Sequence, residues 1–287
     1  MGNKFFRTIL IVISFLATSV GLASCGNTYT PSYDNLSFAV ISEEEKICEV
    51  NGYKKYYNDE RDNNIYIPKM WNDYKVTSIG GSAFRKCTSL SSISIPKSVI
   101  SIGFGAFLDC TSLSSIVIPN SVTSLGGYVF HDCASLSSVK IGNGVTSIGD
   151  DTFYGCSSLS SIVIPKSVTS IGESAFNLCT SLSSIVIPDS VTSIDHAAFQ
   201  RCSSLSSVTI GNGVTSIGEL AFSFCPSLSS IVIPDSVTSI GSAVFYSSKS
   251  LSDVYYIGSE EQWNAISIDK SNSDLYSATI HYNYVGK

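Results

Sequence analysis

The sequence of 287 residues has little charge and no stripe of basic residues. Charged residues make up only 14% of the chain, hydrophobic residues make up 44%, and the formal net charge is −6. Proteins that bind nucleic acid usually carry clustered lysine and arginine along one face. The composition therefore argues against nucleic acid as a partner, and it favours a fold with a well-buried core.

Motifs of catalysis and of metal binding are also missing. No G-x-S-x-G element is present, and His131, His196 and His281 have no repeated carboxylate or nucleophile beside them. None of the nine cysteines belongs to a C-x-x-C pair, the close spacing that zinc sites use. We therefore expect no enzyme activity, no cofactor and no metal site.

What the chain has instead is a unit of 23 residues, seen most clearly from Ile162 to Ser184. Three landmarks recur in phase: Phe at 84, 107, 130, 153, 176, 199, 222 and 245, Cys at 87, 110, 133, 156, 179, 202 and 225, and Leu at 90, 113, 136, 159, 182, 205, 228 and 251. A fixed period of this length is the signature of a solenoid, in which each unit buries its apolar side against its neighbours. The repeat predicts one elongated domain.

The pattern inside each unit predicts which side chains face the core. Ile162 and Ile164 are two residues apart on a strand and therefore point inward together, whereas Val163 points outward. Pro165 ends the strand, because proline cannot donate to a ladder. At a strand spacing of roughly 4.8 Å, eight units predict a sheet about 40 Å long, with the phenylalanines stacked into a spine.

The cysteines share the phase of the core residues. Stacked thiols could lie near enough for disulfides in an exported protein, but a strand-like stack leaves little freedom for the required torsion. A buried ladder of small free thiols is the favoured interpretation, and Cys48 is expected to be structural as well.

The L-x-x-I-x-I-P strand, the V-T-S-I-G step and the A-F-x-x-C close, as in Leu182 to Cys202, resemble leucine-rich repeats of the BspA-like (treponemal-type) class. The resemblance runs from about Val76 to Leu251. It implies a β-rich arc with a parallel sheet on one face, short strands, turns and 3₁₀ segments on the other, and a cap at each end. Many leucine-rich repeats carry Asn after the strand, but this chain has Ser at five such positions, so we expect no continuous Asn ladder: Ser98, Ser121, Ser167, Ser190 and Ser236.

The N-terminus predicts export and a lipid anchor. Lys4 and Arg7 precede an apolar run from Ile9 to Leu16 that is too short for a membrane span, so residues 1–24 indicate a signal peptide. The segment ends in L-A-S-C, which resembles a bacterial lipobox and implies that Cys25 is acylated. The alternative is an ordinary secretory signal followed by a chance cysteine. The expected location is the cell envelope, at the outer membrane, with the surface and periplasmic faces both left open.

The remaining boundaries follow from composition. Residues 25–35 are expected to form a polar tether, 36–75 an N-terminal cap hairpin with an irregular first repeat, 76–253 the repeats, and 254–287 a C-terminal cap. The S-E-E-Q segment that starts at Ser259 fits a helix capping box, so Trp263 is expected on a short helix, and alternation from Ala278 to Tyr284 predicts a final strand. Both caps should seal the open ends of the core.

The outward residues of the strands are the candidate partner-binding positions: Ser94, Val117, Lys140, Val163, Val186, Thr209, Val232 and Tyr255. A row of exposed valines is typical of an interaction site, although β-branched residues also suit any exposed strand. The BspA-like resemblance implies adhesion to host matrix proteins or to other bacteria. The leading interpretation is a non-enzymatic, lipid-anchored protein that binds a macromolecule through this face. The alternatives are a surface carbohydrate-binding lipoprotein, which would use Tyr255, Tyr256 and Trp263 for stacking, and a structural spacer of the envelope.

Overall fold

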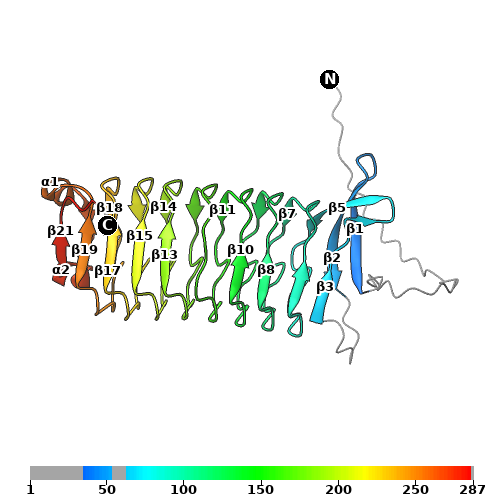
Figure 1. The fold of residues 1–287 in the computed structure, drawn as a ribbon, viewed down its shortest axis with the longest axis horizontal. Coiled ribbons are helices and arrows are strands. Elements are labelled where there is room, and N and C mark those ends of the chain that lie inside the picture. Colours follow the sequence, from blue (N-terminus) through cyan, green and yellow to red (C-terminus); the bar gives the residue numbers. More distant parts are fainter. Residues whose placement is uncertain (1–34, 54–62, 286–287) are drawn as a thin grey trace, which may run out of the picture. The chain divides into compact units, whose positions relative to one another are not determined.

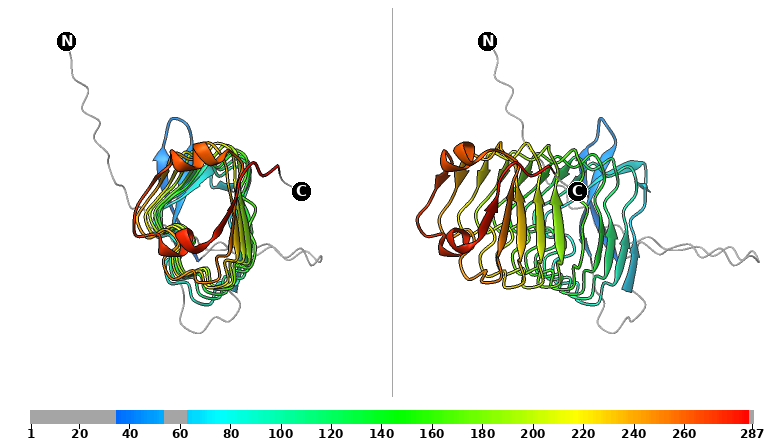
Figure 2. Two further views of the ribbon diagram at one scale, coloured as in Figure 1. Left: turned by 90° about the vertical axis from the view of Figure 1, so that its left-hand side faces the viewer. Right: turned by 60° about the vertical axis from the view of Figure 1, so that its left-hand side comes forward.

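The computed structural model is a β-solenoid of about nine turns with parallel sheets and little helix. It describes residues 35–53 and 63–285, so the predicted signal peptide, Cys25 and most of the tether lie outside the described residues. The coils stack side by side along one axis (Figure 1), and a view along that axis shows them superposed around a common interior (Figure 2). Each coil has two strand-bearing sides and a third side made of turns. Among the described residues, no helix has the length and apolar character needed to cross a membrane.

The first strand row carries the predicted L-x-x-I-x-I strands. Its members pair in parallel, with equivalent residues of successive repeats side by side, as in Ile185 with Val208 and Val208 with Ile231. The row comprises β3 (Asn64–Tyr66), β6 (Ser92–Ser94), β8 (Ser115–Val117), β10 (Ser138–Lys140), β13 (Ser184–Ile187), β15 (Ser207–Ile210), β17 (Ser230–Ile233), β19 (Asp253–Tyr256) and β21 (Thr279–His281).

The second strand row is formed by the V-T-S-I-G steps, and most of its strands are only two residues long. It comprises β5 (Tyr74–Ile79), β7 (Ser101–Ile102), β9 (Ser124–Leu125), β11 (Ser147–Ile148), β12 (Ser170–Ile171), β14 (Ser193–Ile194), β16 (Ser216–Ile217), β18 (Ser239–Ile240) and β20 (Ser267–Ile268). A glycine follows seven of these nine strands, and Asp195 and Asp269 follow β14 and β20. At several of these glycines the preceding coil is too close for a side chain. A Cβ on Gly103 would lie 2.6 Å from the backbone nitrogen of Gly81, and one on Gly241 would lie 2.7 Å from that of Glu219.

The prediction of one continuous sheet is wrong. The first row is divided into two sheets, β10-β8-β6-β3 and β13-β15-β17-β19-β21, because residues 161–164 between them form no strand. The second row is divided between β9 and β11. The stack nevertheless continues through both gaps on the turn side, where the Phe130 amide donates to the Thr152 carbonyl at 2.9 Å. Coil-to-coil contact therefore does not depend on unbroken strand pairing.

The turn side is held by backbone hydrogen bonds from alternate residues. In one coil the amides of Ser174, Phe176 and Leu178 donate to carbonyls of the following coil at 2.9, 2.7 and 2.9 Å. Ser174 and Leu178 adopt left-handed backbone conformations, with φ of 52° and 61°, and the same two positions do so in every repeat from residue 82 to residue 247. Turns thus take the place of the 3₁₀ segments that the family resemblance implied for this side of the repeats.

The interior follows the prediction closely. All eight repeat phenylalanines, from Phe84 to Phe245, are fully buried, and neighbouring rings stack with centroids 5.1–5.9 Å apart. Fully burying one such side chain contributes roughly 1.5–3 kcal/mol. The thiols lie beside this spine, and each one from Cys110 to Cys225 donates to the carbonyl of a phenylalanine in the preceding coil at 3.0–3.2 Å. Where the cysteine column ends, the Ser248 hydroxyl makes the same bond, to Phe222 at 2.8 Å.

The N-terminal end is closed by the predicted hairpin. β1 (Leu36–Ser42) pairs antiparallel with β2 (Ile47–Tyr53), and β2 pairs with β5 of the first coil. The longer first repeat also contains β4 (Met70–Trp71), which folds back on β5 through a turn with Asn72 at φ 52°. This second hairpin was not predicted. It brings Trp71 against Phe38, with ring centroids 5.0 Å apart.

The C-terminal end is closed by two short helices, α1 (Glu260–Asn264) and α2 (Ser273–Ser277), and by β21. The predicted capping box is confirmed, since the Gln262 amide donates to Ser259 Oγ and the Ser259 amide donates to Gln262 Oε1. Trp263 is buried at the end of the core. The final strand β21 (Thr279–His281) is shorter than the strand predicted from Ala278 to Tyr284. It follows directly after α2, which ends at Ser277.

Candidate binding surface

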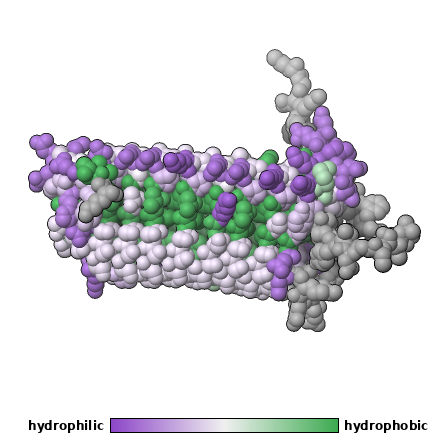
Figure 3. All heavy atoms as spheres, viewed as in Figure 1, coloured by the Kyte–Doolittle hydropathy of each residue, from purple (hydrophilic) through white to green (hydrophobic). Residues whose placement is uncertain are grey.

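The outward residues of the first strand row form one line across the coils, which we call the strand face. Its members are the predicted Ser94, Val117, Lys140, Val163, Val186, Thr209, Val232 and Tyr255, of which Val232 and Tyr255 are half-buried and the other six exposed. The exposed fraction of the side chain is 57% for Val117, 81% for Val163 and 65% for Val186. Figure 3 shows a hydrophobic band on this face, between a hydrophilic edge and a paler zone.

Alternation along the strand produces this exposure. Ile162 and Ile164 lie in the core at 8% and 5% exposure, and Val163 between them faces solvent. The same alternation holds in β13, where Ile185 and Ile187 are buried on either side of Val186. The outward valines are therefore not needed by the core and are available to a partner.

The hydrophilic edge is a column of exposed turn residues that follows each strand: Lys97, Asn120, Asn143, Lys166, Asp189, Asn212 and Asp235. Two of its amides are tied to the preceding coil, since the Asn143 amide donates to Asn120 Oδ1 at 3.0 Å and the Asn212 amide to Asp189 Oδ1 at 2.8 Å. The charges of Lys166 and Asp189 lie one coil apart at the middle of this edge.

The paler zone is rich in serine, and many of its hydroxyls bind the backbone. Ser206 Oγ donates to the Ser183 carbonyl at 3.0 Å, and Ser229 Oγ donates to the Ser206 carbonyl at 3.3 Å. Equivalent bonds join other coils along the same column. These hydroxyls fasten one coil to the next, so we assign the zone a structural role.

A serine ladder replaces the asparagine ladder of other leucine-rich repeats. Ser167 Oγ donates to the Val145 carbonyl at 2.6 Å, and Ser190 Oγ donates to the Val168 carbonyl at 2.6 Å. Ser121 and Ser236 make the same bond at 2.6 and 2.7 Å. The comparison with Asn-bearing repeats did not predict that these serine hydroxyls would join one coil to the next. The recurrence of serine at one position of the repeat could have indicated it.

The aromatic residues considered for sugar stacking mostly close the C-terminal end. Tyr256 is 1% exposed and Trp263 is 8% exposed, and their rings meet edge to face at 5.1 Å. Tyr255 packs against His281 and Tyr284, each with ring centroids 4.8 Å away. A sugar could reach only the remaining part of Tyr255, which removes the platform that the carbohydrate hypothesis needs.

A surface aromatic stack on the turn side was not found from the sequence. His131 lies between Tyr128 and Tyr154, with ring centroids 5.3 and 4.5 Å apart, and Phe104 packs beside Tyr128 at 60% exposure. A hydrogen bond with the Asp151 carboxylate, followed by the charge of that group, raises the pKa of Tyr128. No repeat landmark marks these positions, because their residue types change from coil to coil.

The cysteine ladder is unsuited to nucleophilic or metal chemistry. All eight cysteines of the described residues are buried, and each is a thiol. Burial raises the pKa of Cys133 and of Cys225 to about 12, and it raises the pKa of Cys179 well above its ordinary value. In the N-terminal cap, burial and then the charge of Glu49 raise the pKa of Cys48 to about 11. Since the thiolate is the reactive form, these side chains are inert in the folded state.

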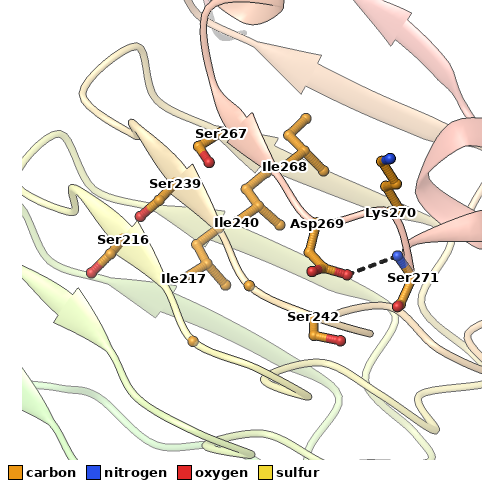
Figure 4. Close-up of a pocket in the computed structure, with 12 residues that line it drawn as sticks. Ser216, Ile217, Ser239, Ile240, Ser242, Ser267, Ile268, Asp269, Lys270 and Ser271 are labelled. Carbon is orange, nitrogen blue, oxygen red and sulfur yellow. Dashed lines mark hydrogen bonds between the residues drawn. The ribbon is translucent and has the colours of Figure 1, made fainter.

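An open depression beside the second strand row offers little chemistry either. Figure 4 shows Ser216, Ser239 and Ser267 along it, near the C-terminal cap. Asp269 lies at its end and accepts a hydrogen bond from the Ser271 amide at 2.9 Å. Within the part of the chain that the structure describes, no group of His, Cys, Asp and Glu side chains is arranged to hold a metal ion.

A family model for the BspA type leucine-rich repeat region, with six copies, matches residues 52–183 and 169–281. The chain belongs to the BspA-type leucine-rich repeat family. Proteins with such repeats are generally non-enzymatic binding scaffolds. The match confirms the family that the strand, step and close motifs of this BspA-type sequence predicted. A comparison with curated proteins gives no match.

Solved bacterial structures share the fold of this BspA-type protein. A leucine-rich repeat protein of Treponema pallidum is 23% identical, with a TM-score of 0.53 over 77% of this chain and 90% of that one. A leucine-rich repeat protein of Bacteroides ovatus is 24% identical, with a TM-score of 0.50 over 90% of this chain and 72% of that one. At this level of identity the likeness establishes the fold alone.

Proposed function

We propose that this BspA-type protein is a non-enzymatic, lipid-anchored protein of the cell envelope that binds another macromolecule through the strand face. The observation that carries the proposal is the exposed neighbouring pair Val163 and Val186, with Val117 exposed two coils before Val163. Exposed apolar side chains that adjoin one another are typical of interaction sites. The rigid stack beneath them keeps the line in a fixed geometry, which lowers the entropic cost of binding.

The anchor is proposed from the sequence. Cys25 follows the lipobox-like segment and lies outside the described residues, and the first strand begins at Leu36. The ten intervening residues would reach at most about 35 Å if fully extended. An anchored solenoid would therefore stay close to the membrane, with its N-terminal cap as the end nearest the anchor.

The anchor is tested by fractionation of cells that express the wild type or Cys25→Ser. We expect the wild type in the membrane fraction and the variant in the soluble fraction, because only the wild type can be acylated at this position. A Cys25→Ser protein that still fractionates with lipid would contradict the anchor. This test is independent of any partner.

The binding role is tested by screening the purified protein against host matrix proteins and a glycan array. For any ligand found, the Val163→Glu, Val186→Glu double variant should bind more weakly, because central desolvated positions dominate interfaces. The matched control is Thr169→Glu, Thr192→Glu, which places the same charges in the same two coils but beside the second strand row. Equal loss in both double variants, or no loss in either, would show that the strand face is not the site.

A glycan hit would favour the carbohydrate alternative, for which the half-buried Tyr255 is the most accessible of the three aromatic residues considered. Tyr255→Ala would then reduce binding while the valine double variant would not. A structural spacer would bind neither class of ligand. The valine line favours a protein over both alternatives.

A further inference from the structure

The strand face has an order of residues that reads nearly the same from either end. From the N-terminal side its six central members are Val117, Lys140, Val163, Val186, Thr209 and Val232. Reversed, the order is valine, threonine, valine, valine, lysine and valine. Only Lys140 and Thr209 exchange places, so the midpoint of the line falls between Val163 and Val186.

We propose that the occupant of the strand face is a second copy of this chain, related by a two-fold axis that runs along the strands between Val163 and Val186. This inference rests on the proposed function, since it uses the same face. In a two-fold interface, a residue that contacts a given position of the partner is contacted by that same residue of the partner. Val163 would therefore pack on the partner's Val186, and Val186 on the partner's Val163.

The charged turn residues agree with this arrangement. A two-fold axis along the strands keeps the hydrophilic edge of one copy over the hydrophilic edge of the other. Lys166 follows the extended segment 161–164, Asp189 follows β13, and both are exposed. The axis places Lys166 opposite the partner's Asp189, and Asp189 opposite the partner's Lys166. Complementary charges of this kind fix the register of an interface.

The only charge within the six central positions is also accommodated. Lys140 lies opposite the partner's Thr209, so two like charges do not meet. A two-fold axis along the stack would instead place Lys140 on the partner's Lys140. It would also lay the hydrophilic edge of one copy over the serine zone of the other. Like charges placed directly opposite are destabilising, so the two-fold axis along the strands agrees better with the charges than the axis along the stack.

The size of the face fits a reversible dimer. Six coils at roughly 4.8 Å, each contributing a strip of about six residues from the serine zone to the hydrophilic edge, cover about 600 Å² on each copy. The total of roughly 1,200 Å² lies at the lower limit for specific interfaces and is typical of weak ones. The strand faces of the two copies would lie against each other with aligned strands, about 10 Å apart, which is a common spacing and orientation of packed sheets.

The test is sedimentation velocity on residues 26–287, which retain the whole compact unit Tyr33–Lys287 with both caps. We compare the wild type with Val163→Glu, Val186→Glu and with Val163→Lys, Val186→Lys. The dimer fraction of the wild type should rise with concentration and be clearly detectable by about 100 µM, as expected for an interface of this size. Each double variant should dimerise at least about tenfold more weakly, because like charges face each other across the axis.

The decisive measurement is the equimolar mixture of the two double variants. Glutamate of one variant then lies opposite lysine of the other, so the mixture should recover the dimer. A foreign partner offers no reason for such recovery. The control Thr169→Glu, Thr192→Glu should dimerise like the wild type, and circular dichroism should show that all variants are folded.

A second pair of variants tests the register. Lys166→Asp should weaken the dimer, and Lys166→Asp combined with Asp189→Lys should restore it, because the charges are exchanged on both copies. A mixture of the valine variants that stays monomeric, or a double exchange that restores nothing, overturns the two-fold arrangement.

The remaining outcomes separate this inference from the proposed function. A wild type that stays monomeric over the whole range overturns the second copy as occupant, while a foreign ligand that needs Val163 and Val186 would still support the binding role. A dimer that survives in both valine variants overturns the inference, because the copies then pair through another surface.

Discussion

The body of the solenoid and its two ends solve the same burial problem by different means. In the body, a coil is covered by a neighbour with the same side chains, so Phe153 stacks between Phe130 and Phe176 at 5.4 and 5.3 Å. At the ends no further copy exists. The only two tryptophans of the chain lie there, Trp71 against Phe38 and Trp263 against Tyr256.

This difference shows what repetition supplies and what it leaves undone. A repeated unit gives every interior residue a partner of its own kind, but it always leaves one exposed core face at each end. Closing that face needs residues that break the pattern, such as the extra hairpin at Met70–Trp71 and the capped helix at Glu260–Asn264. Stability should therefore depend on the body collectively and on the caps locally.

The largest effect is expected from pH, through the buried thiols. Burial raises the pKa of Cys133 and Cys225 to about 12 and that of Cys156, Cys179 and Cys202 well above the ordinary value. A raised pKa contributes stability that is complete below the unfolded value, near 8.5, and that is lost as pH rises toward the folded value. Each thiol that stays protonated then costs about 1.4 kcal/mol per pH unit, so these five alone cost roughly 7 kcal/mol at pH 9.5. Cys48, with its pKa raised to about 11, adds to the loss.

Chemical denaturation of the Cys25→Ser protein at pH 7.5 and 9.5 measures this loss. The Cys179→Ser variant, which copies the arrangement seen at Ser248, should lose about 1.4 kcal/mol less over the same interval, because one titrating group is gone. Thiol labelling of the native protein at pH 7.5 should be slow and become complete on unfolding. An unfolding free energy that is the same at both pH values would show that the thiols ionise freely in the folded state.

The next effect concerns the phenylalanine spine. Phe153→Ala should lower the free energy of unfolding by roughly 3–5 kcal/mol, because it leaves a cavity between two stacked rings of the packed core. Denaturant titration measures the change, and Val163→Ala in the same coil is the exposed control, expected within about 0.5 kcal/mol of the wild type. Indistinguishable midpoints for Phe153→Ala and the wild type would contradict a packed spine.

A smaller and local effect is expected at the C-terminal cap. Trp263→Ala should cost about 3 kcal/mol, the lower end for such truncations, because this buried side chain lies at the end of the core, where the cap can relax around the cavity. Hydrogen exchange should show lost protection in β19 and β17 and unchanged protection in β6 and β8, since each coil interacts mainly with its neighbours. Uniform loss along the whole stack would mean that the ends and the body unfold as one.

The smallest effect tests how the C-terminal helix is held in place. Ser259→Ala removes the side-chain acceptor of the capping box and should cost about 1 kcal/mol. Ser259→Asp restores an acceptor at the same position and should recover most of the loss. Thermal unfolding followed by circular dichroism measures both variants, and a loss in Ser259→Asp equal to that in Ser259→Ala would show that the loss does not come from the side-chain acceptor.

Much of this architecture could be predicted because the period of the pattern matches the physics of a strand. Alternation placed Ile162 and Ile164 inside and Val163 outside, and the 23-residue phase placed the phenylalanines and thiols in one interior. The strand face was likewise predicted residue by residue, because outward positions follow directly from inward ones.

Other features could not be predicted, because neighbouring coils determine them. Residues 161–164 and 184–187 have the same sequence, S-I-V-I, yet only the second segment forms a strand. Left-handed backbone at Leu178 has no local signal either, since leucine rarely adopts it. In this conformation its amide donates to the Gln200 carbonyl of the next coil, a contact that the local sequence does not reveal. The Lys166 and Asp189 arrangement becomes visible only when the turns are placed over one another.

The matching upper and lower surfaces of each coil have a consequence for how such a protein can change in size. Residues 162–171, 185–194 and 231–240 are almost identical in sequence, so removal or duplication of one 23-residue block between them leaves every later landmark in phase. Each such step would shift the C-terminal cap by roughly 4.8 Å along the stack without altering a contact inside either cap. The length of the solenoid can therefore change in steps of one whole coil.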